Sequence, residues 1–406
     1  MEWKEVRLGD VVEIVNGFAF KSKAFTLEGI PVIKIKNIKA GKVILNDLDY
    51  ISTSDINPKY TKIRSSDILI TMTGNRMDGS PETWVGKVSL FRHQGDFYLN
   101  QRVSALRLID DTVDNNFLSY YLSSWQSQLY FALNSNSSGG QANITPAVVQ
   151  EYRLMVPELE TQRSIASILS SLDRKIELNN KINADLEEMA QAIFKNWFVD
   201  FEPFKDGRFV DSELGMIPEG WKVGSPYEYA KVVYGAPYKS AKFNDNGEGL
   251  PLIRIRDLKN CNPQFYTPEI LPQTEYVNMG DIVAGMDAEF VPHIWKGNTG
   301  LLNQRVCKLM PQQTSISNLF VLYLMKPELE FVQSYKTGTT VSHLGKADID
   351  KFVVVLPPLE VVEECSKILD SILQRIKNIS AESRNLSTLR DTLLPRLMSG
   401  ELEVPE

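Results

Sequence analysis

Two four-residue segments come close to a motif with which enzymes hold an adenine base. They are Asn57-Pro58-Lys59-Tyr60 and Asn262-Pro263-Gln264-Phe265. In the Asn-Pro-Pro-aromatic motif, asparagine and backbone oxygens bind the adenine amino group while the ring stacks on the flipped base. Both segments lack the second proline, and no glycine-rich strand-to-helix turn for a cofactor precedes either of them. We therefore predict two Asn-Pro turns. A catalytic DNA adenine methyltransferase is the less favoured interpretation of these segments.

Residues that could support other reactions do not form the required patterns. Gly41-Lys42, Gly86-Lys87 and Gly345-Lys346 each lack the following Ser or Thr of a nucleotide-binding phosphate loop. The carboxylate-plus-lysine cluster of a nuclease is not evident. Three cysteines and three histidines lie far apart, which excludes a disulfide framework and a zinc pattern of familiar spacing. We expect no catalytic residue, metal or cofactor in this chain, and a reducing, cytoplasmic location.

Ordered matches at a slowly falling offset indicate that the chain is a tandem repeat. The matches are Trp3-Lys4 with Trp221-Lys222, Ile30–Lys36 with Leu250–Arg256, Leu99–Val103 with Leu302–Val306, and Val156-Pro157 with Leu356-Pro357. The offset falls from 220 to 200 residues, so the second copy has the shorter interior. In the first copy we expect strands at residues 11–15, 32–35, 68–73 and 103–108 and a helical piece near 116–133. A mixed α/β fold is therefore expected in each copy.

A long helix is expected after each mixed α/β segment. Apolar residues recur at steps of three and four over residues 165–197, and the same phase returns over 365–397 at a constant offset of 200. Sustained over about four heptads, this pattern is typical of a coiled coil. The order domain, helix, domain, helix closes if the two helices are antiparallel, which predicts a pseudo-two-fold symmetric molecule. A plain amphipathic helix packed on its own domain is the alternative.

Polar residues mark the middle of the contact between the two predicted helices, which we call the helix seam. The seam positions are Asn179 and Asn183 in the first helix and the corresponding Ile379 and Ser383 in the second. Buried asparagines can fix register and partner choice.

The repeat divides the chain into five parts. We expect a first domain at 1–157, a spacer helix at 158–198, a linker at 199–220, a second domain at 221–357, and a spacer helix with its tail at 358–406.

The net charge of −7 hides two larger segments that are slightly basic. Residues 1–157 and 221–356 each carry a net charge of +1, and the deficit lies in the connecting segments. The candidate phosphate-binding residues are Lys34, Lys36, Lys39 and Lys42 in the first segment and Arg254, Arg256 and Lys259 in the second. Residues 34 and 36 would share one face of a strand, where such charges contact phosphates and position a domain on DNA. A solvated strand face is the alternative.

Two long strings of residues resemble the specificity subunits of type I restriction-modification systems. They are the linker Asn196–Phe204 with Gly215–Trp221, and the tail Leu389–Leu402; the resemblance covers essentially the whole chain. It implies two target recognition domains, each reading one half of a split, asymmetric DNA site through the major groove. It also implies helices that set the spacer and dock two methyltransferase (modification) subunits. Restriction (endonuclease and translocase) subunits join the complex, and S-adenosylmethionine, ATP and magnesium belong to those partners.

Loops that differ between the copies are the expected base readers, because two unlike half-sites need unlike readers. The candidate loops are residues 73–78 in the first copy, with Asn75 and Arg76, and residues 287–290 through 296–298 in the second, with Lys296. Asparagine can pair with adenine and arginine with guanine, each worth about 1–3 kcal/mol of discrimination. An ordinary polar turn explains any one of them equally well. Two alternatives to a DNA-binding specificity subunit stay open. One is a catalytic DNA adenine methyltransferase or a fused restriction-modification enzyme, and the other is a coiled-coil scaffold that does not bind DNA.

Three further polar regions complete the candidate DNA-binding residues. Loops containing Gly139, Gln141 and Thr339 suit backbone amides that approach a phosphate, although a flexible loop explains them almost as well. The best-kept polar residues between the copies are Gln101 and Arg102 with Gln304 and Arg305. Their sameness favours a structural or phosphate-binding role, since sequence readers should diverge. The second copy departs from the first at residues 342–345, where Ser-His-Leu-Gly replaces Ala-Asn-Ile-Thr.

Overall fold

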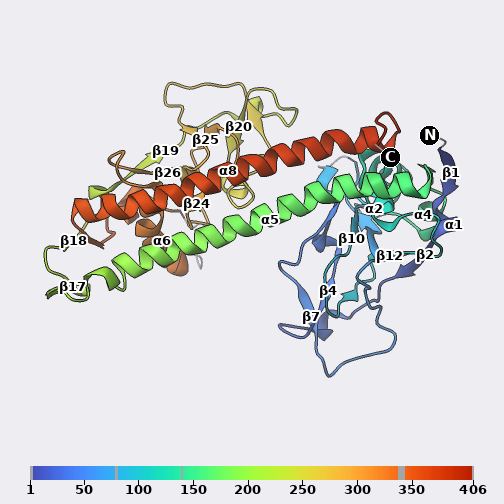
Figure 1. Ribbon diagram of the computed structural model, residues 1–406, viewed down its shortest axis with the longest axis horizontal. Helices are drawn as coiled ribbons and strands as arrows, with labels where there is room; N and C mark the ends of the chain where they lie inside the picture. Colours follow the sequence, from blue (N-terminus) through green and yellow to red (C-terminus); the bar gives the residue numbers. More distant parts are fainter. Residues whose placement is uncertain (1–2, 78–80, 139, 337–342, 405–406) are drawn as a thin grey trace. The chain divides into compact units, whose positions relative to one another are not determined.

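The computed structural model describes residues 3–77, 81–138, 140–336 and 343–404. The chain forms two compact units, which are considered one at a time (Figure 1). Unit 1 consists of Met1–Arg174 and Leu386–Glu406, and unit 2 of Lys175–Asn385. The boundary crosses both long helices, so each unit contains one mixed α/β domain and a part of each helix.

Unit 1 is built on two four-stranded sheets. The first has the order β10 (Val88–Leu90), β8 (Ile68–Thr71), β12 (Val103–Leu108), β2 (Val12–Asn16), and the second β11 (Tyr98–Leu99), β4 (Ile30–Ile33), β7 (Asp49–Ile51), β3 (Phe25–Thr26). Smaller sheets join β1 (Lys4–Arg7) to β15 (Arg153–Val156), β5 (Ile38–Lys39) to β6 (Lys42–Val43), and β13 (Asn136–Ser138) to β14 (Gln141–Asn143) and β9 (Thr73–Gly74). Its short helices are α1 (Leu8–Val11), α2 (Asn115–Ser123), α3 (Trp125–Leu133) and α4 (Pro146–Gln150).

Unit 2 repeats the first of the four-stranded sheets of unit 1 strand for strand, and it shares three strands of the second sheet, whose fourth strand joins at the other edge. In unit 2 the orders are β19 (Ala230–Tyr234), β26 (Val306–Pro311), β23 (Ile282–Gly285), β24 (His293–Ile294), and β21 (Tyr266–Thr267), β20 (Leu250–Ile253), β25 (Gly300–Leu302), β22 (Tyr276–Val277). Two-stranded sheets join β18 (Lys222–Gly224) to β27 (Val354–Leu356) and β16 (Phe209–Ser212) to β17 (Gly215–Pro218). The helices beside the domain are α6 (Asn318–Lys336) and α7 (Lys346–Ile349). The mixed α/β fold predicted for each copy is confirmed.

Two local predictions about unit 1 were wrong. The strand expected through residue 35 ends at Ile33, because the Asn37 side chain accepts a hydrogen bond from the Lys34 N–H at 3.0 Å and residues 35–37 turn into a short 3-10 helix. The single helical piece is two helices, because Ser124 has an extended backbone and its hydroxyl caps α3. In unit 2 the corresponding helix, α6, is continuous and contains Pro327.

The two long helices, α5 (Leu159–Phe198) and α8 (Leu359–Met398), are antiparallel within each unit. In unit 2, Asn179 donates to Glu382 at 2.8 Å and Asn183 donates to Ser380 at 3.1 Å, so numbers rise along one helix as they fall along the other. In unit 1, Arg390 contacts Asp173 at 2.8 Å. The predicted antiparallel pairing is confirmed.

Each unit buries the apolar stripe of its helix parts against its own domain as well as against the other helix. In unit 1, Ile165 and Leu169 of α5 share a core with Phe117 of α2. In unit 2, Leu369 and Ile376 of α8 lie in the same core as the residues of α6. Burial of such side chains stabilises by roughly 1.5–3 kcal/mol each, so the helices and the domains stabilise one another.

None of the helices in the described ranges is both long enough and apolar enough to cross a membrane.

Candidate nucleic-acid interface

Carboxylates hold two of the predicted phosphate-binding lysines of unit 1. Lys34 contacts Asp49 at 2.9 Å and lies 3.5 Å above the ring of Phe25, while Lys36 contacts Asp47 at 2.8 Å. Burial works against ionisation of Asp49, but hydrogen bonds from the two lysines hold the pKa of its carboxyl below the ordinary value. Positive charge at Lys34 and Lys36 is therefore largely compensated within the protein, and the two residues do not form the expected strand face.

The matching cations of unit 2 are compensated in a similar way. Arg254 pairs with Asp257 at 3.3 Å and stacks on Phe265 at 4.4 Å. Lys259 pairs with Glu289 at 3.1 Å. These contacts place both side chains in local networks of the domain.

Lys296, predicted to lie near bases, is directed toward the long helices of unit 2. Its ammonium pairs with Glu187 of α5, and its backbone carbonyl accepts a hydrogen bond from Arg384 of α8 at 2.6 Å. This position fits a contact between the domain and the helices better than a contact with a base.

Five of the predicted cations remain without a carboxylate partner in the described part of the chain. They are Lys39, Lys42, Arg76, Arg102 and Arg256, all of them exposed. Since uncompensated charge is what attracts phosphates and base acceptors, these five are the stronger candidates for DNA contact.

Several predicted residues of unit 1 come together around β9 and β14. Asn75 and Arg76 directly follow β9 and are exposed, and the Arg102 guanidinium donates to the Gln141 amide oxygen of β14 at 2.9 Å. Between these strands, the Thr73 hydroxyl donates to Asn143 at 2.7 Å. Gly139 lies outside the described residues, as does Thr339 in unit 2.

Thr73 and Asp287 belong to the loops expected to read bases, but their partners in the structure, Asn143 and His343, were missed as candidates. A signal for His343 was present, because the second copy departs from the first at that position. In unit 2 the His343 ring nitrogen Nδ1 lies 2.7 Å from the Asp287 carboxylate, which also pairs with Arg305 at 3.2 Å. Since Asp287 and His343 are bridged as antiparallel strand residues, the pair corresponds to Thr73 and Asn143.

The matched glutamine–arginine pairs lie in equivalent tight turns. In unit 1 the Val103 N–H donates to the Asn100 carbonyl, and in unit 2 the Val306 N–H donates to the Asn303 carbonyl. Both hydrogen bonds are 2.9 Å long and close the turns. Gln101 and Gln304 are exposed on these turns. A Cβ on Gly17 would lie only 2.1 Å from the Asn100 carbonyl oxygen, and one on Gly235 would lie 2.2 Å from that of Asn303. These close approaches explain why both copies have a glycine at this position.

The two Asn-Pro segments do not form a base-binding pocket. Asn57 starts an exposed turn. The Tyr60 N–H donates to the Asn57 carbonyl at 2.9 Å and closes this turn. In unit 2, Asn262 is exposed and the Phe265 ring is occupied by Arg254. The Tyr60 ring packs against other aromatic rings of its own domain, so neither aromatic ring is available beside its asparagine for a flipped base.

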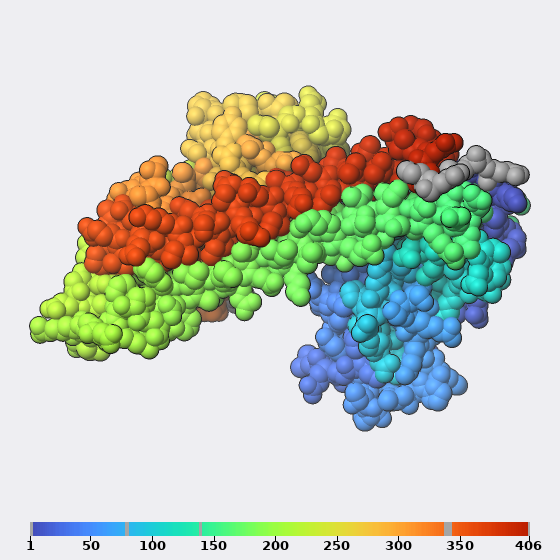
Figure 2. Space-filling model, viewed as in Figure 1, coloured from blue at the N-terminus to red at the C-terminus, as the bar shows by residue number. Residues whose placement is uncertain are grey.

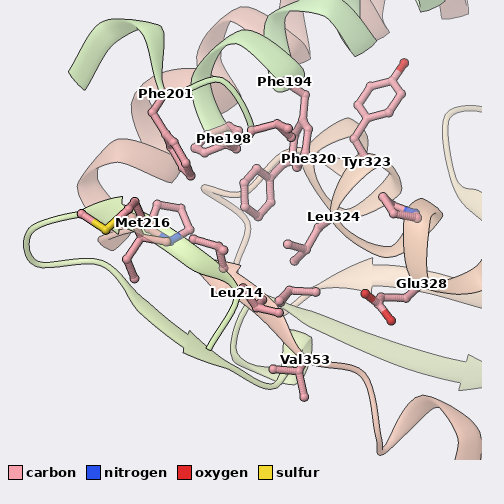
Figure 3. A pocket seen from close by; sticks show the side chains of 16 residues that line it. Phe194, Phe198, Phe201, Leu214, Met216, Phe320, Tyr323, Leu324, Glu328 and Val353 are labelled. Atoms are coloured by element: carbon pink, nitrogen blue, oxygen red, sulfur yellow. The ribbon is translucent and has the colours of Figure 1, made fainter. Parts of the chain in front are cut away.

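An apolar cavity of about 270 Å³ lies in unit 2 between the end of α5, α6 and the β16–β17 hairpin (Figure 3). Its walls include Phe194, Phe198 and Phe320, and Glu328 is the one carboxylate among the lining residues. Burial raises the pKa of Glu328. A lone acid among aromatic rings provides neither an acid–base pair nor a set of metal ligands, so this cavity suits apolar contacts.

Across the described ranges, no three His, Cys, Asp or Glu side chains gather where they could hold a metal ion. The two domains carry unlike polar loops at equivalent places, and exposed arginines such as Arg76 and Arg256 lie on these domains. Exposed arginine and amide side chains are the groups that read DNA bases.

The family model for the type I restriction modification DNA specificity domain matches residues 1–188 and 218–386. The chain is similar to the type I restriction enzyme MjaIX specificity subunit of Methanocaldococcus jannaschii, at 25% identity over 100% of this chain and 94% of the relative. It is also similar to the HindI specificity subunit of Haemophilus influenzae, at 25% identity over 99% and 100% of the two chains. A crystal structure of a type I restriction-modification S subunit from M. genitalium has the same fold, with a TM-score of 0.55, 15% identity and coverage of 98% and 96%.

The chain belongs to the family of type I restriction-modification DNA specificity proteins, and both of its domains carry the family's pattern. It is a specificity subunit, a DNA-recognition protein whose role is not catalytic.

Proposed function

We propose that each unit reads one half of a split, asymmetric DNA site and that the two long helices set the distance between the halves. The observation that carries the proposal is the duplication. The family pattern occurs twice, on two domains whose first sheets have the same order of strands, and the polar loops at equivalent positions differ. Two copies of one scaffold with unlike loops are what an asymmetric bipartite site requires.

We also propose two modification (methyltransferase) subunits as partners, docked on the long helices, with restriction subunits completing the complex. S-adenosylmethionine, ATP and magnesium would bind those partners. In Figure 2 the parts of α5 and α8 in each unit present a surface that no other segment of that unit covers. Val199, Leu214 and Met216, beside the cavity of unit 2, are each at least half exposed. Exposed apolar groups of this kind mark protein–protein contacts. A cytoplasmic location is part of the same proposal.

The test exchanges the second domain, residues 221–357, for that of another specificity chain with a different target. The variant is combined with its modification subunits, and methylated adenines are mapped in DNA. We expect one half of the recognised site to change and the other half and the spacer to stay the same. A site in which both halves change, or neither does, would contradict the proposal.

Two controls separate this function from the alternatives. The purified chain alone, given S-adenosylmethionine, is expected not to methylate DNA; methylation would support the enzyme reading. The chain alone is also expected to bind duplex DNA weakly, with an affinity that falls as salt rises. A scaffold that does not bind DNA would show no such salt-dependent binding.

A further inference from the structure

Three chain segments meet in the same backbone arrangement in both units. In unit 1, the Met72 N–H donates to the Arg102 carbonyl at 2.9 Å, and the Met72 carbonyl accepts from the Ile144 N–H at 3.0 Å. The equivalent bonds of unit 2 run from the Met286 N–H to the Arg305 carbonyl at 2.9 Å and from the Leu344 N–H to the Met286 carbonyl at 2.7 Å. Each arrangement holds an exposed arginine beside the residue that follows its methionine, Thr73 in unit 1 and Asp287 in unit 2.

In unit 1 the arginine has neutral neighbours. The Arg102 guanidinium donates to the Gln141 amide oxygen, and Thr73 donates to Asn143. We call Thr73, Arg102, Gln141 and Asn143 cluster 1. Arg102 and Gln141 are exposed, and the hydrogen bond to Gln141, the one that the Arg102 guanidinium makes among the described residues, orients this group without cancelling its charge. Most of its five N–H donors are left for another molecule.

In unit 2 the equivalent arginine has an acidic neighbour. Asp287 pairs with Arg305 at 3.2 Å and with the His343 ring at 2.7 Å. We call Asp287, Arg305 and His343 cluster 2. The side chains of Arg305 and His343 are 55% and 47% exposed, so this cluster also faces solvent. The carboxylate compensates the arginine and adds acceptor sites that cluster 1 lacks, since a carboxylate can accept about four hydrogen bonds.

We propose that clusters 1 and 2 are corresponding base-reading points of the two units, and that the neighbours of the shared arginine set which base each unit selects. The free donors of cluster 1 suit the O6 and N7 acceptors of guanine, whereas the carboxylate of cluster 2 suits the amino group of cytosine or adenine. The inference rests on the proposed reading of one half-site by each unit.

Two observations separate the clusters from other polar surface. The backbone arrangement is the same in both copies, so the arginine is placed equivalently, while the bridged pair beside it differs: Thr73 and Asn143 in unit 1, Asp287 and His343 in unit 2. In addition, four of the other predicted DNA contacts, Lys34, Lys36, Arg254 and Lys259, are engaged by carboxylates or rings on their own domains. A purely structural arginine would be expected to keep its partner in both copies, as the asparagine turns before β12 and β26 do.

The experiment exchanges the neighbours of the arginine between the units. One variant combines Thr73→Asp with Asn143→His, and the other combines Asp287→Thr with His343→Asn. Each is assembled with the modification subunits, and the methylated sequence motif is mapped. We expect each exchange to alter at least one base in its own half-site, with preference for the original base falling by about 10-fold. The other half-site stays unchanged and reports intact folding and assembly.

Two single substitutions keep the test decisive if an exchange variant does not assemble. Arg102→Lys retains the charge but loses the planar donor geometry, so it is expected to relax the same half-site. Arg153→Met removes an exposed ion pair with Glu5 on the same unit and is expected to leave the motif unchanged. A wild-type motif and wild-type rate in the exchange variants, or in Arg102→Lys, would overturn the inference. If the wild-type complex itself has no split motif, the proposed function fails instead.

Discussion

Lysines that follow β4 show how one carboxylate changes what a positive charge can do. Lys34 and Lys36 both reach Asp49, at 2.9 and 3.2 Å, so two cations share an anion before any DNA is present. Arg76 and Arg102 are also positively charged but have no such partner among the described residues. The difference depends on side chains that are distant in sequence. Because of it, Arg76 and Arg102 are stronger candidates for DNA contact in unit 1 than Lys34 and Lys36.

Lys87 is the residue for which we predict a measurable pH dependence. Its side chain is almost fully buried and donates to the Pro81 carbonyl at 2.8 Å. Burial, with a smaller contribution from Lys39, lowers the pKa of Lys87 from 10.5 to about 8. Between these two values the unfolded chain binds more protons than the folded chain, so the free energy of unfolding should rise with pH across that window.

Lys87→Met should remove this rise and leave the remaining pH dependence as it was. The measurement is urea unfolding of the wild type and the variant at several pH values from 7.5 to about 10.5. Lys62→Met is the matched control, because Lys62 is 58% exposed in its ion pair with Asp96. Parallel stability curves for Lys87→Met and wild type would refute the prediction.

At the scale of elements, the seam between α5 and α8 combines apolar packing with a polar centre. Asn179 and Asn183 are buried between the helices of unit 2, as is Ser383, while Ile379 is half-buried. Both asparagines donate hydrogen bonds across the seam, but their carbonyl oxygens have no partner in the described structure. Such groups reduce stability and favour one register of the two helices over its neighbours.

Asn183→Leu is therefore expected to stabilise unit 2 by about 1 kcal/mol, because it removes an unsatisfied buried carbonyl and adds apolar contact. Chemical unfolding measures the change. Lys181→Leu on the exposed side of the same helix should alter stability by less than about 0.5 kcal/mol. Destabilisation by Asn183→Leu would indicate that the asparagine is fully satisfied in the working protein.

The two units also stabilise their helix parts differently. Unit 1 uses a polar network in which Asp173 accepts from Tyr120 at 2.5 Å and from Arg390 at 2.8 Å. At the equivalent places unit 2 has Leu373 and Ala190, both buried in its core. The repeat has thus kept the helix geometry while replacing an ion pair with apolar packing, which costs no desolvation of charge.

At the scale of the whole molecule, the prediction concerns the spacer between the half-sites. Seven residues added to each long helix, near residues 174 and 385, would lengthen each helix by about 10 Å at 1.5 Å per residue. We expect the spacer of the recognised site to grow by about three base pairs, at 3.4 Å each, with both half-sites unchanged. Mapping of methylated adenines provides the readout.

Insertion into only one helix is the matched control, since it breaks the pairing of the seam and should abolish modification. A spacer that does not change after insertion into both helices would be incompatible with a ruler role. The seven-residue length is chosen because it preserves the heptad phase of the apolar stripe.

The sequence by itself determined the repeat, the two long helices and their antiparallel pairing, because these depend on periodicity and on matched local strings such as Leu99–Val103 and Leu302–Val306. Its mixed α/β assignment for each copy also required only local propensity. Strand ends were less predictable, since the Asn37 side chain ended β4 through a hydrogen bond that no periodicity reveals.

Only the tertiary structure decided which cations are compensated and which side chains surround Arg102 and Arg305. Asp49 lies 15 residues from Lys34, Gln141 lies 39 residues from Arg102, and His343 lies 56 residues from Asp287. Contacts of this kind depend on how strands from separate parts of the chain are paired, and pairing register is a property of the folded domain. Electrostatic compensation acts over a few ångströms in space, so the reading surface could be located only after folding had brought those residues together.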